Sequence, residues 1–253
     1  GGALLRGGNG LGCAGMARYR ANFFNQKYGC AAVFRQIPSK VLSAEQLGLP
    51  PILMKAAMLR KGLVLVTGPT GSGKSTTLAG IIDHANKNRK DHILTVEDPI
   101  EFVHESQGCI VNHREVGLHT KSFGAALRGA LREDPDIILV GEIRDLETAG
   151  MAIQASLTGH LVFSTLHTND APSAVTRMVD MHVPAYLVAS SVVAVLAQRL
   201  VRLNCTKCKH PIQLPESVLV DAGIPLELAK KATFMKGKGC GNCNKSGYRG
   251  RQG

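Results

Sequence analysis

The sequence of 253 residues contains no tryptophan and only four tyrosines, and aromatic residues make up 4% of it. Proteins that bind single-stranded nucleic acid interleave aromatic with basic residues, so this scarcity argues against a plain nucleic-acid-binding protein. Long apolar runs are also missing. The longest weakly polar stretch, 183–197, has 15 residues, whereas a transmembrane helix needs about 20. The sequence therefore predicts no membrane span.

The chain also lacks an initial methionine and a basic-then-apolar leader with a cleavage site. It opens instead with seven glycines in its first 15 residues. We therefore expect a fragment of a longer protein, cut at both ends. Its 44% hydrophobic content still suffices for one sizeable core and a smaller appendage.

The net charge of +11 is distributed unevenly along the chain. Residues 1–60 carry 8 Lys and Arg against 1 acid, and residues 199–253 carry 11 against 3, which gives +7 and +8. The residues between them carry 11 against 15, which gives −4. We expect the two basic ends to help the protein dock on acidic lipid or partner surfaces.

Short apolar runs rich in Val, Ile and Leu recur after residue 60, at 63–67, 93–96, 137–140 and 161–165. Such runs are typical of buried parallel strands. Helical patterns separate or follow them, at 74–86, 122–132, 146–157, 171–181 and 185–200. This alternation predicts an α/β fold with a parallel sheet covered on both faces.

The N-terminal part predicts a separate small domain. Residues 17–37 mix aromatic and β-branched residues with polar ones around Gly29, which predicts a strand, a turn and a strand. Residues 38–51 contain three prolines and predict a linker with at most one short helix. We therefore expect a partial N-terminal sheet domain and linker over 1–45 and a second domain over 46–253.

A phosphate-binding loop pattern, GPTGSGKS, follows the first apolar run and precedes a helical pattern. Its glycines let backbone N–H groups cradle phosphate beside the positive end of a helix. We expect Lys74 to reach the β and γ phosphates and Ser75 to ligate Mg²⁺. The alternative is a glycine-rich turn without a ligand. The predicted nucleotide-binding residues are Gly68, Pro69, Thr70, Gly71, Ser72, Gly73, Lys74, Ser75, Thr76 and Glu97.

Acidic residues follow the next two apolar runs. Glu97, Asp98 and Glu101 lie within five residues after the second run, where ligands of open α/β sheets bind. The alternative there is a solvated acidic turn. The third run ends Gly141-Glu142, although a Walker B strand usually places Asp directly after its apolar run. We therefore assign Glu142 to the Mg²⁺ side, through water.

Two CxxC pairs predict a metal site near the C-terminus. Cys205 and Cys208 are followed, after 31 residues, by Cys240 and Cys243, which can close a tetrahedral zinc site with no open position and no catalysis. We expect this site to hold together a small zinc-binding subdomain over 200–250, although zinc ribbons also contact nucleic acid. The pattern favours a reducing compartment over a disulfide scaffold.

Four boxes, GPTGSGKST (68–76), TVEDPIEF (95–102), DIILVGEIRD (136–145) and TGHLVFSTLHTN (158–169), occur in this order. With them the chain resembles the bacterial type II secretion and type IV pilus motor ATPases of GspE, PilB and PilT type. The resemblance covers nearly the whole chain. It implies a RecA-like P-loop core and, at the N-terminus, a partial small α+β domain of PAS-like type. It also implies Mg-dependent ATP hydrolysis by a hexamer that is cytoplasmic and peripheral on the inner membrane. It further implies a membrane platform protein as partner and no nucleic-acid substrate.

The resemblance also implies residue roles. Glu101 polarises the attacking water, and Glu142 acts on the metal side with Glu97 in support. His160 and His167, at the start and end of the fourth apolar run, read the state of the nucleotide. The third box of that family is itself Gly-Glu, which agrees with the departure at this position.

Two arginines in the N-terminal sheet complete the implied site. Arg20 and Arg35 match positions from which the family supplies arginines to the triphosphate as subunits close. A trans-acting arginine is worth roughly 10³ to 10⁵ in rate in other P-loop systems. The alternative is a pair of ordinary surface arginines.

The signals for the direction of the motor conflict. The four cysteines resemble the secretion and pilus-assembly enzymes, whereas residues 24–29, 34–40 and 104–115 resemble the pilus-retraction enzymes. We give the cysteines more weight and predict a motor for pilus assembly or type II secretion, with a retraction motor as the alternative. A P-loop small-molecule kinase and a nucleic-acid-stimulated ATPase are competing hypotheses of other classes.

Overall fold

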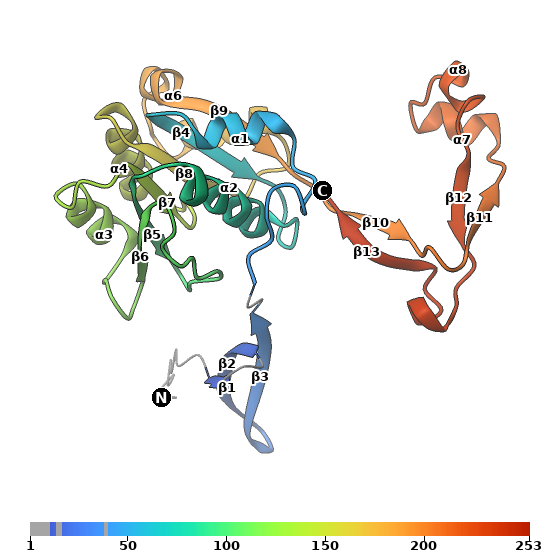
Figure 1. Cartoon of the computed structure of the whole chain (residues 1–253), viewed down its shortest axis with the longest axis horizontal. Helices are drawn as coiled ribbons and strands as arrows, with labels where there is room; N and C mark the ends of the chain where they lie inside the picture. The colour runs from blue at the N-terminus through green and yellow to red at the C-terminus, as the bar shows by residue number, and fades with distance from the viewer. Residues whose placement is uncertain (1–10, 14–16, 38–39) are drawn as a thin grey trace. The chain divides into compact units, whose positions relative to one another are not determined.

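The structure is a computed structural model that describes residues 11–13, 17–37 and 40–253. The chain divides into two compact units, Gly1–Gln198 and Arg199–Gly253. Figure 1 shows the elements of both. Among the described residues, no helix combines the length and apolar character needed to cross a bilayer.

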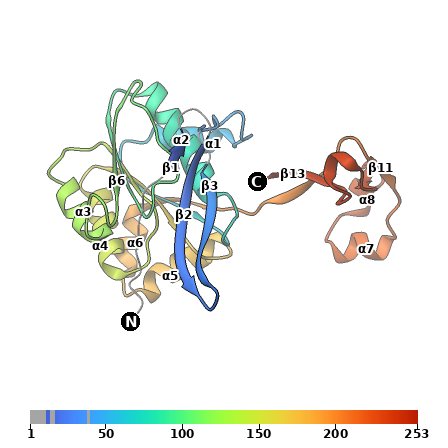
Figure 2. The same ribbon diagram turned by 90° about the horizontal axis from the view of Figure 1, so that it is seen from below.

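A three-stranded antiparallel sheet opens the described chain. It contains β1 (Leu11–Cys13), β2 (Ala17–Gln26) and β3 (Gly29–Ile37), in the order β1-β2-β3. The long hairpin of β2 and β3 is clear in Figure 2. Its tight turn ends at Gly29, whose φ of +117° favours glycine. The predicted strand, turn and strand are confirmed.

A six-stranded parallel sheet forms the centre of the first unit. Its strands are β4 (Gly62–Thr67), β5 (His92–Glu97), β6 (Ile110–Glu115), β7 (Ile137–Val140), β8 (Leu161–Leu166) and β9 (Val192–Ala197). They lie in the order β6-β5-β7-β8-β4-β9. All five pairings are parallel, so every strand ends at the same edge. The four predicted strands and the α/β class are confirmed.

Helices cover both faces of this sheet (Figure 1). They are α1 (Pro51–Ala57), α2 (Lys74–Asn88), α3 (Phe123–Ala130), α4 (Leu146–Leu157), α5 (Ala171–Asp180) and α6 (Ala185–Ser191). Alternate residues of one strand face opposite layers. Leu63 and Leu65 pack with the layer of α3 to α6, while Val64 and Val66 pack with α1 and α2. The continuous apolar strands follow from this burial on both faces.

One predicted element is wrong. The pattern over 185–200 predicted a single helix, but α6 ends at Ser191 and the chain continues as β9. β9 pairs in parallel with β4, from Leu63 and Val192 to Thr67 and Ala197. The apolar, β-branched sequence there is compatible with a strand as well as a helix. Hydrogen bonding to β4 stabilises the strand. Neither α1 nor the polar edge strand β6 was predicted.

The second unit is built from two short ribbons. β10 (Val201–Asn204) pairs with β13 (Tyr248–Gln252), and β11 (Lys209–Ile212) pairs with β12 (Phe234–Gly237), both antiparallel. Helices α7 (Glu216–Asp221) and α8 (Leu226–Ala229) connect β11 to β12, and a 3₁₀ turn, η1 (Gly241–Cys243), precedes β13. Its buried apolar residues are Cys205, Leu219 and Cys243. Such a small core needs another source of stability.

Removing the largest buried side chain of β8 tests the packing of the sheet. Phe163 is fully buried between strands and the layer of α1 and α2, so Phe163→Ala should lower the free energy of unfolding by about 3–5 kcal/mol. Urea unfolding followed by circular dichroism measures this loss. The exposed Val175→Ala on α5 is the control, with an expected change within about 0.5 kcal/mol. A loss in Phe163→Ala below about 1 kcal/mol would contradict the packing described.

Candidate nucleotide-binding site

The phosphate-loop sequence lies between the end of β4 and the start of α2, at the carboxyl edge of the sheet. Gly71 and Gly73 have φ of +79° and +87°, which other residues rarely adopt. A Cβ on Gly68 would lie 2.3 Å from the carbonyl oxygen of Gln198. Helix α2 begins without a side-chain cap, so the N–H groups of its first turn face the loop without a side-chain acceptor. This backbone is an anion-binding cradle.

Lys74 is the buried cation of the cradle, with 8% of its surface exposed. Its Nζ donates to the carbonyl oxygens of Gly68 and Pro69, at 2.8 and 3.1 Å. Burial lowers the pKa of Lys74, and the carboxylates of Glu142 and Glu101 oppose that shift. The loop therefore holds this ammonium where acids from two other strand ends can act on it.

Glu97, the last residue of β5, is the most perturbed carboxyl of the site. Its Oε2 accepts a hydrogen bond from the backbone N–H of Glu101 at 3.2 Å, whereas Oε1 is buried without a partner. Burial raises the pKa of Glu97 to about 7, and the charges of Glu101 and Glu115 add to the shift. Beside it lies a cavity of about 30 Å³, whose lining includes Ser75.

The glycine in place of a Walker B aspartate is hydrogen-bonded to both neighbouring strands. A Cβ on Gly141 would make ordinary contacts of 3.4 Å with the Cα of Glu97 and the carbonyl oxygen of Val96, so packing alone does not require glycine here. Gly141 also donates its N–H to Val96 at 2.8 Å and accepts from Thr165 Oγ1 at 2.7 Å. The end of β7 is thus clamped between β5 and β8, which leaves the next residue, Glu142, to present the carboxylate.

Glu142 lies between two cationic or potentially cationic side chains. Arg144 forms an ion pair with its Oε1, and His167 Nε2 lies 3.4 Å from Oε2. His167 follows the end of β8, at the same edge of the sheet as the phosphate loop. The structure thus brings Lys74, Glu142 and His167 to one edge. The sequence did not single out Arg144, although its charge two residues after Glu142 was visible in the third box.

His160 does not join this group. It directly precedes β8, so it lies at the opposite edge of the sheet, where its carbonyl oxygen accepts from the N–H of Gly62 at 3.1 Å. The length of β8, at about 3.3 Å per residue, separates it from the carboxyl edge. Its Nδ1 lies 2.9 Å from the carbonyl oxygen of Ala155. Within one chain, His160 and His167 therefore lie at opposite edges of the sheet, and a role of His160 in reading the nucleotide stays a prediction.

Glu101 and the two arginines lie outside the strands of this edge. Glu101 is exposed in the loop after β5. Arg20 and Arg35 are direct partners in the register of β2 and β3, but their side chains lie outside the described part of the chain. Their approach to a triphosphate stays a prediction.

The donor set suits Mg²⁺. A hard cation prefers oxygen ligands, and this edge offers the Ser75 hydroxyl, the Glu142 carboxylate and the unpartnered Glu97 Oε1. The ion would neutralise charge that develops on the phosphates.

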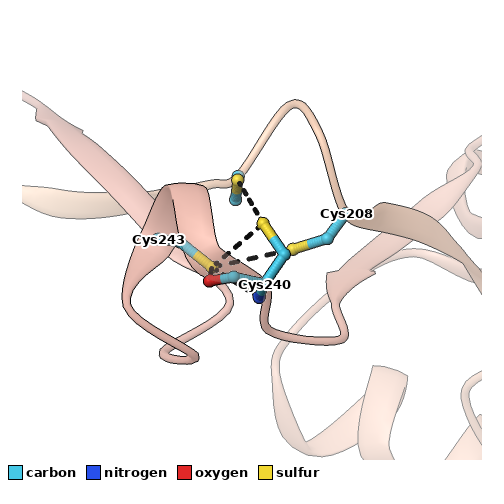
Figure 3. A group of neighbouring side chains, drawn as sticks. Cys208, Cys240 and Cys243 are labelled. Carbon is cyan, nitrogen blue, oxygen red and sulfur yellow. Dashed lines mark hydrogen bonds between the residues drawn. The ribbon is translucent and has the colours of Figure 1, made fainter.

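The four predicted cysteine ligands converge in the second unit (Figure 3). Their sulfur atoms all lie within 4.8 Å of one another. The Sγ separations of Cys205 and Cys240, Cys208 and Cys243, and Cys240 and Cys243 are 3.9, 3.8 and 3.7 Å. A tetrahedral zinc site with Zn–S bonds of about 2.3 Å places its sulfurs about 3.8 Å apart. The arrangement therefore fits zinc.

Nearby N–H groups favour the thiolate form at two of the four cysteines, whereas burial raises the pKa of Cys208 to about 12. Asn242 Nδ2 donates to Cys205 Sγ at 3.5 Å and lowers the pKa of Cys205 to about 6. The backbone N–H groups of Cys240 and Gly247 donate to Cys243 Sγ, and these bonds lower the pKa of Cys243. Deprotonated sulfur is the form that binds metal.

A parallel sheet with a glycine-rich cradle, a buried lysine and acids at its carboxyl edge defines a P-loop nucleotide-binding domain. The family described as "Type II/IV secretion system protein" matches residues 17–253. The chain belongs to this family, as the four boxes indicated.

The relatives of the chain include both a pilus-retraction ATPase and a type II secretion protein. The chain is 55% identical over 195 residues to the type IV pilus retraction ATPase PilT of Pseudomonas aeruginosa, covering 74% of this chain and 56% of that protein. It is 46% identical over 240 residues to type II secretion system protein E of Aeromonas hydrophila, covering 92% and 47%.

A solved structure confirms the fold. The crystal structure of the pilus retraction motor PilT with bound ADP matches with a TM-score of 0.73 and 48% identity, covering 76% of this chain and 58% of that one. The chain thus spans about half the length of the curated relatives it matches.

Neutralising Glu97 tests the buried carboxyl. Because its folded-state pKa of about 7 exceeds the ordinary value of 4.5, the folded protein binds this proton more tightly, and stability falls as pH rises from about 4.5 to 7. Without Mg²⁺ or nucleotide, Glu97→Gln should be more stable than the parent by roughly 2–3 kcal/mol near pH 8 and equally stable near pH 4. Urea unfolding at both pH values measures this. The exposed Glu105→Gln should show no such pH dependence, and equal stability of Glu97→Gln and parent near pH 8 would contradict the burial argument.

Proposed function

We propose that this chain is the ATP-hydrolysing part of a hexameric motor that powers type IV pilus assembly or type II protein secretion. One observation carries the proposal: Lys74 in its glycine cradle, with Glu142 and Glu101 close enough to shift its pKa. A charged phosphate tail and a hard cation are the ligands that such a set recognises. Membership of the secretion family supports a motor of a secretion or pilus system. It disfavours a small-molecule kinase or a nucleic-acid-stimulated ATPase.

We assign the residues of the site separate roles in hydrolysis. The N–H groups of 68–75 and Lys74 hold the phosphates, and Ser75 with Glu142 and Glu97 would hold Mg²⁺. When bound, the ion neutralises charge on the phosphates. Glu101, in the loop after β5, polarises the attacking water. His167, beside Glu142, is placed to respond when the γ phosphate leaves.

The remaining assignments concern the neighbouring copies of the motor, its location and its partner protein. We assign Arg20 and Arg35, adjacent on the β2–β3 hairpin, to the triphosphate of a neighbouring copy, and the hairpin itself to a PAS-like domain. Closure and opening between copies then convert hydrolysis into movement. The motor works in the cytoplasm, peripheral on the inner membrane, against a platform protein.

A retraction motor is the second candidate. The 55% identity to PilT favours it over the aligned 195 residues. The alignment with the type II secretion protein extends over 92% of the chain, against 74% for PilT, and this longer match favours assembly or secretion. We therefore base the choice of assembly or secretion over retraction on the four cysteines of residues 199–253.

Two variants test the hydrolytic site. Lys74→Ala removes the cradle ammonium and should abolish detectable ATP binding, while Glu101→Gln should bind ATP but lose about 10²-fold or more in turnover, because it removes the water-polarising base. Binding is measured with a fluorescent ATP analogue and turnover by phosphate release. The matched control is Lys61→Ala, exposed just before β4 at the far edge, which should change neither. Unchanged turnover in Lys74→Ala would contradict the proposal.

We also propose that the four cysteines bind a structural zinc ion. The S···S distances of 3.7–3.9 Å and the scarcity of buried apolar side chains in 199–253 support it. With four thiolates filling the coordination shell, the ion supplies stability and no catalysis.

Zinc content tests this second proposal. The purified chain should contain one zinc ion, and Cys208→Ser should lose it and expose residues 199–253 to proteolysis, because the ion replaces a missing core. Metal analysis and limited proteolysis measure both effects. Cys30→Ser, an exposed cysteine on β3, should retain the metal. Full zinc content in Cys208→Ser would refute the site.

A further inference from the structure

Gln198 is a polar residue at the carboxyl edge of the sheet to which the roles assigned above give no part. It directly follows β9, the edge strand that pairs in parallel with β4, and it is half-buried. The last register pair of the two strands is Thr67 with Ala197. Gln198 therefore lies next to the point where the chain leaves β4 for the phosphate loop.

The backbone of Gln198 holds the start of this loop. Its N–H donates to the carbonyl oxygen of Thr67 at 2.8 Å, one residue past the last register pair. Its carbonyl oxygen lies so close to Gly68 that a Cβ there would come within 2.3 Å of it. This close approach explains the glycine at the first position of the loop.

The side chain of Gln198 holds the other end of the loop. Its Oε1 accepts a hydrogen bond from the Thr77 hydroxyl at 2.7 Å. Thr77 lies in the first turn of α2 and is 2% exposed. The backbone N–H of Thr77 in turn donates to the carbonyl oxygen of Gly73, the last glycine of the loop, at 2.9 Å. Gln198 is thus connected, directly or through Thr77, to both ends of the loop.

A separate set of bonds holds the base of the loop from the side of β8. Thr67 Oγ1 lies 2.6 Å from Thr168 Oγ1 and accepts from the Thr168 N–H at 2.9 Å. β8 and β9 flank β4 on opposite sides, so the end of β4 is fixed from both neighbours. Gln198 adds the connection from this fixed point to α2.

The separation of β4 and α2 matters because the loop between them binds phosphate through its backbone N–H groups. Such groups bind well when they are held within about 0.5 Å of their binding geometry before the ligand arrives. A loop that must be ordered on binding loses affinity. The hydrogen bond between Gln198 and Thr77 is therefore expected to increase the affinity for phosphate without contact to it.

We propose that Gln198 is a positioning residue of the nucleotide site, which holds the phosphate loop in its binding geometry through the hydrogen bond of its Oε1 with Thr77. The proposal deepens the proposed function and rests on it for the ligand, a nucleotide with at least two phosphates. In this role Gln198 acts through the loop and through α2.

Removing either partner of the hydrogen bond in the full chain tests the proposal. Gln198→Met keeps the length of the side chain without the acceptor, and Thr77→Val keeps the shape without the donor. Each should weaken ADP binding about three- to tenfold, the range that one net hydrogen bond supplies. The double variant should bind within about twofold of the weaker single variant, because both changes remove the same bond. Competition with a fluorescent ATP analogue measures these affinities.

Two further measurements separate positioning from a general loss of structure. Pyrophosphate carries two phosphates without the nucleoside, so a change in the loop should weaken its binding by the same factor as that of ADP. Thr77→Ser keeps the hydroxyl and should restore ADP binding to within about twofold of the parent. The matched control is Gln154→Met, the same change at an exposed position of α4, which should leave both affinities within about twofold of the parent.

Unchanged ADP affinity in both Gln198→Met and Thr77→Val, in a parent chain that binds and hydrolyses ATP, would overturn the proposal and leave the proposed function intact. Additive losses in the double variant would also overturn it, as would a loss for ADP without a loss for pyrophosphate. A parent chain that binds no nucleotide would overturn the proposed function and this inference with it.

Discussion

The parallel pairing of β4 with β8 and β9 is the constraint on which the nucleotide site depends. It places β4 inside the sheet, between β8 and the edge strand β9, with the carboxyl ends of β4, β7 and β8 along the same edge. The phosphate loop, Glu142 and His167 all follow strands that end there. A register slip in a fully buried parallel strand would exchange its two faces, and the two apolar layers on either side of β4 prevent it. The geometry of the candidate nucleotide site is thus fixed by the same packing that forms the core.

Much of this arrangement could be predicted, for a physical reason. A strand buried on both faces must be apolar throughout, so 63–67, 93–96, 137–140 and 161–165 stand out from any amphipathic pattern. The phosphate loop is equally legible because its glycines are required by backbone conformation, as φ at Gly71 and Gly73 confirms. Once the strands are parallel, the residue that follows each one must lie at the shared edge.

The errors arose where local sequence permits two structures. Residues 192–197 are apolar and β-branched, and only the exposed hydrogen-bonding edge of β4 makes them a strand instead of a continuation of α6. The role predicted for His160 came from the resemblance, and its position before β8 puts it at the edge of the sheet opposite the phosphate loop. The pKa of Glu97 was also beyond sequence reasoning, because it depends on burial by residues distant in the chain. The sequence shows which residues follow a strand, but not how much water reaches them.

The two units reach stability by different means, and this difference explains the charge distribution. The first unit buries a six-stranded sheet between helices and can keep its charged residues for the site at one edge. The second has few buried apolar side chains, and the zinc ion proposed for the four cysteines would supply the stability that a core supplies elsewhere. Cross-links at four sulfurs would also oppose the mutual repulsion of surface cations. With such a site, residues 199–212 and 230–253 would accommodate their eleven Lys and Arg and no acid on short ribbons.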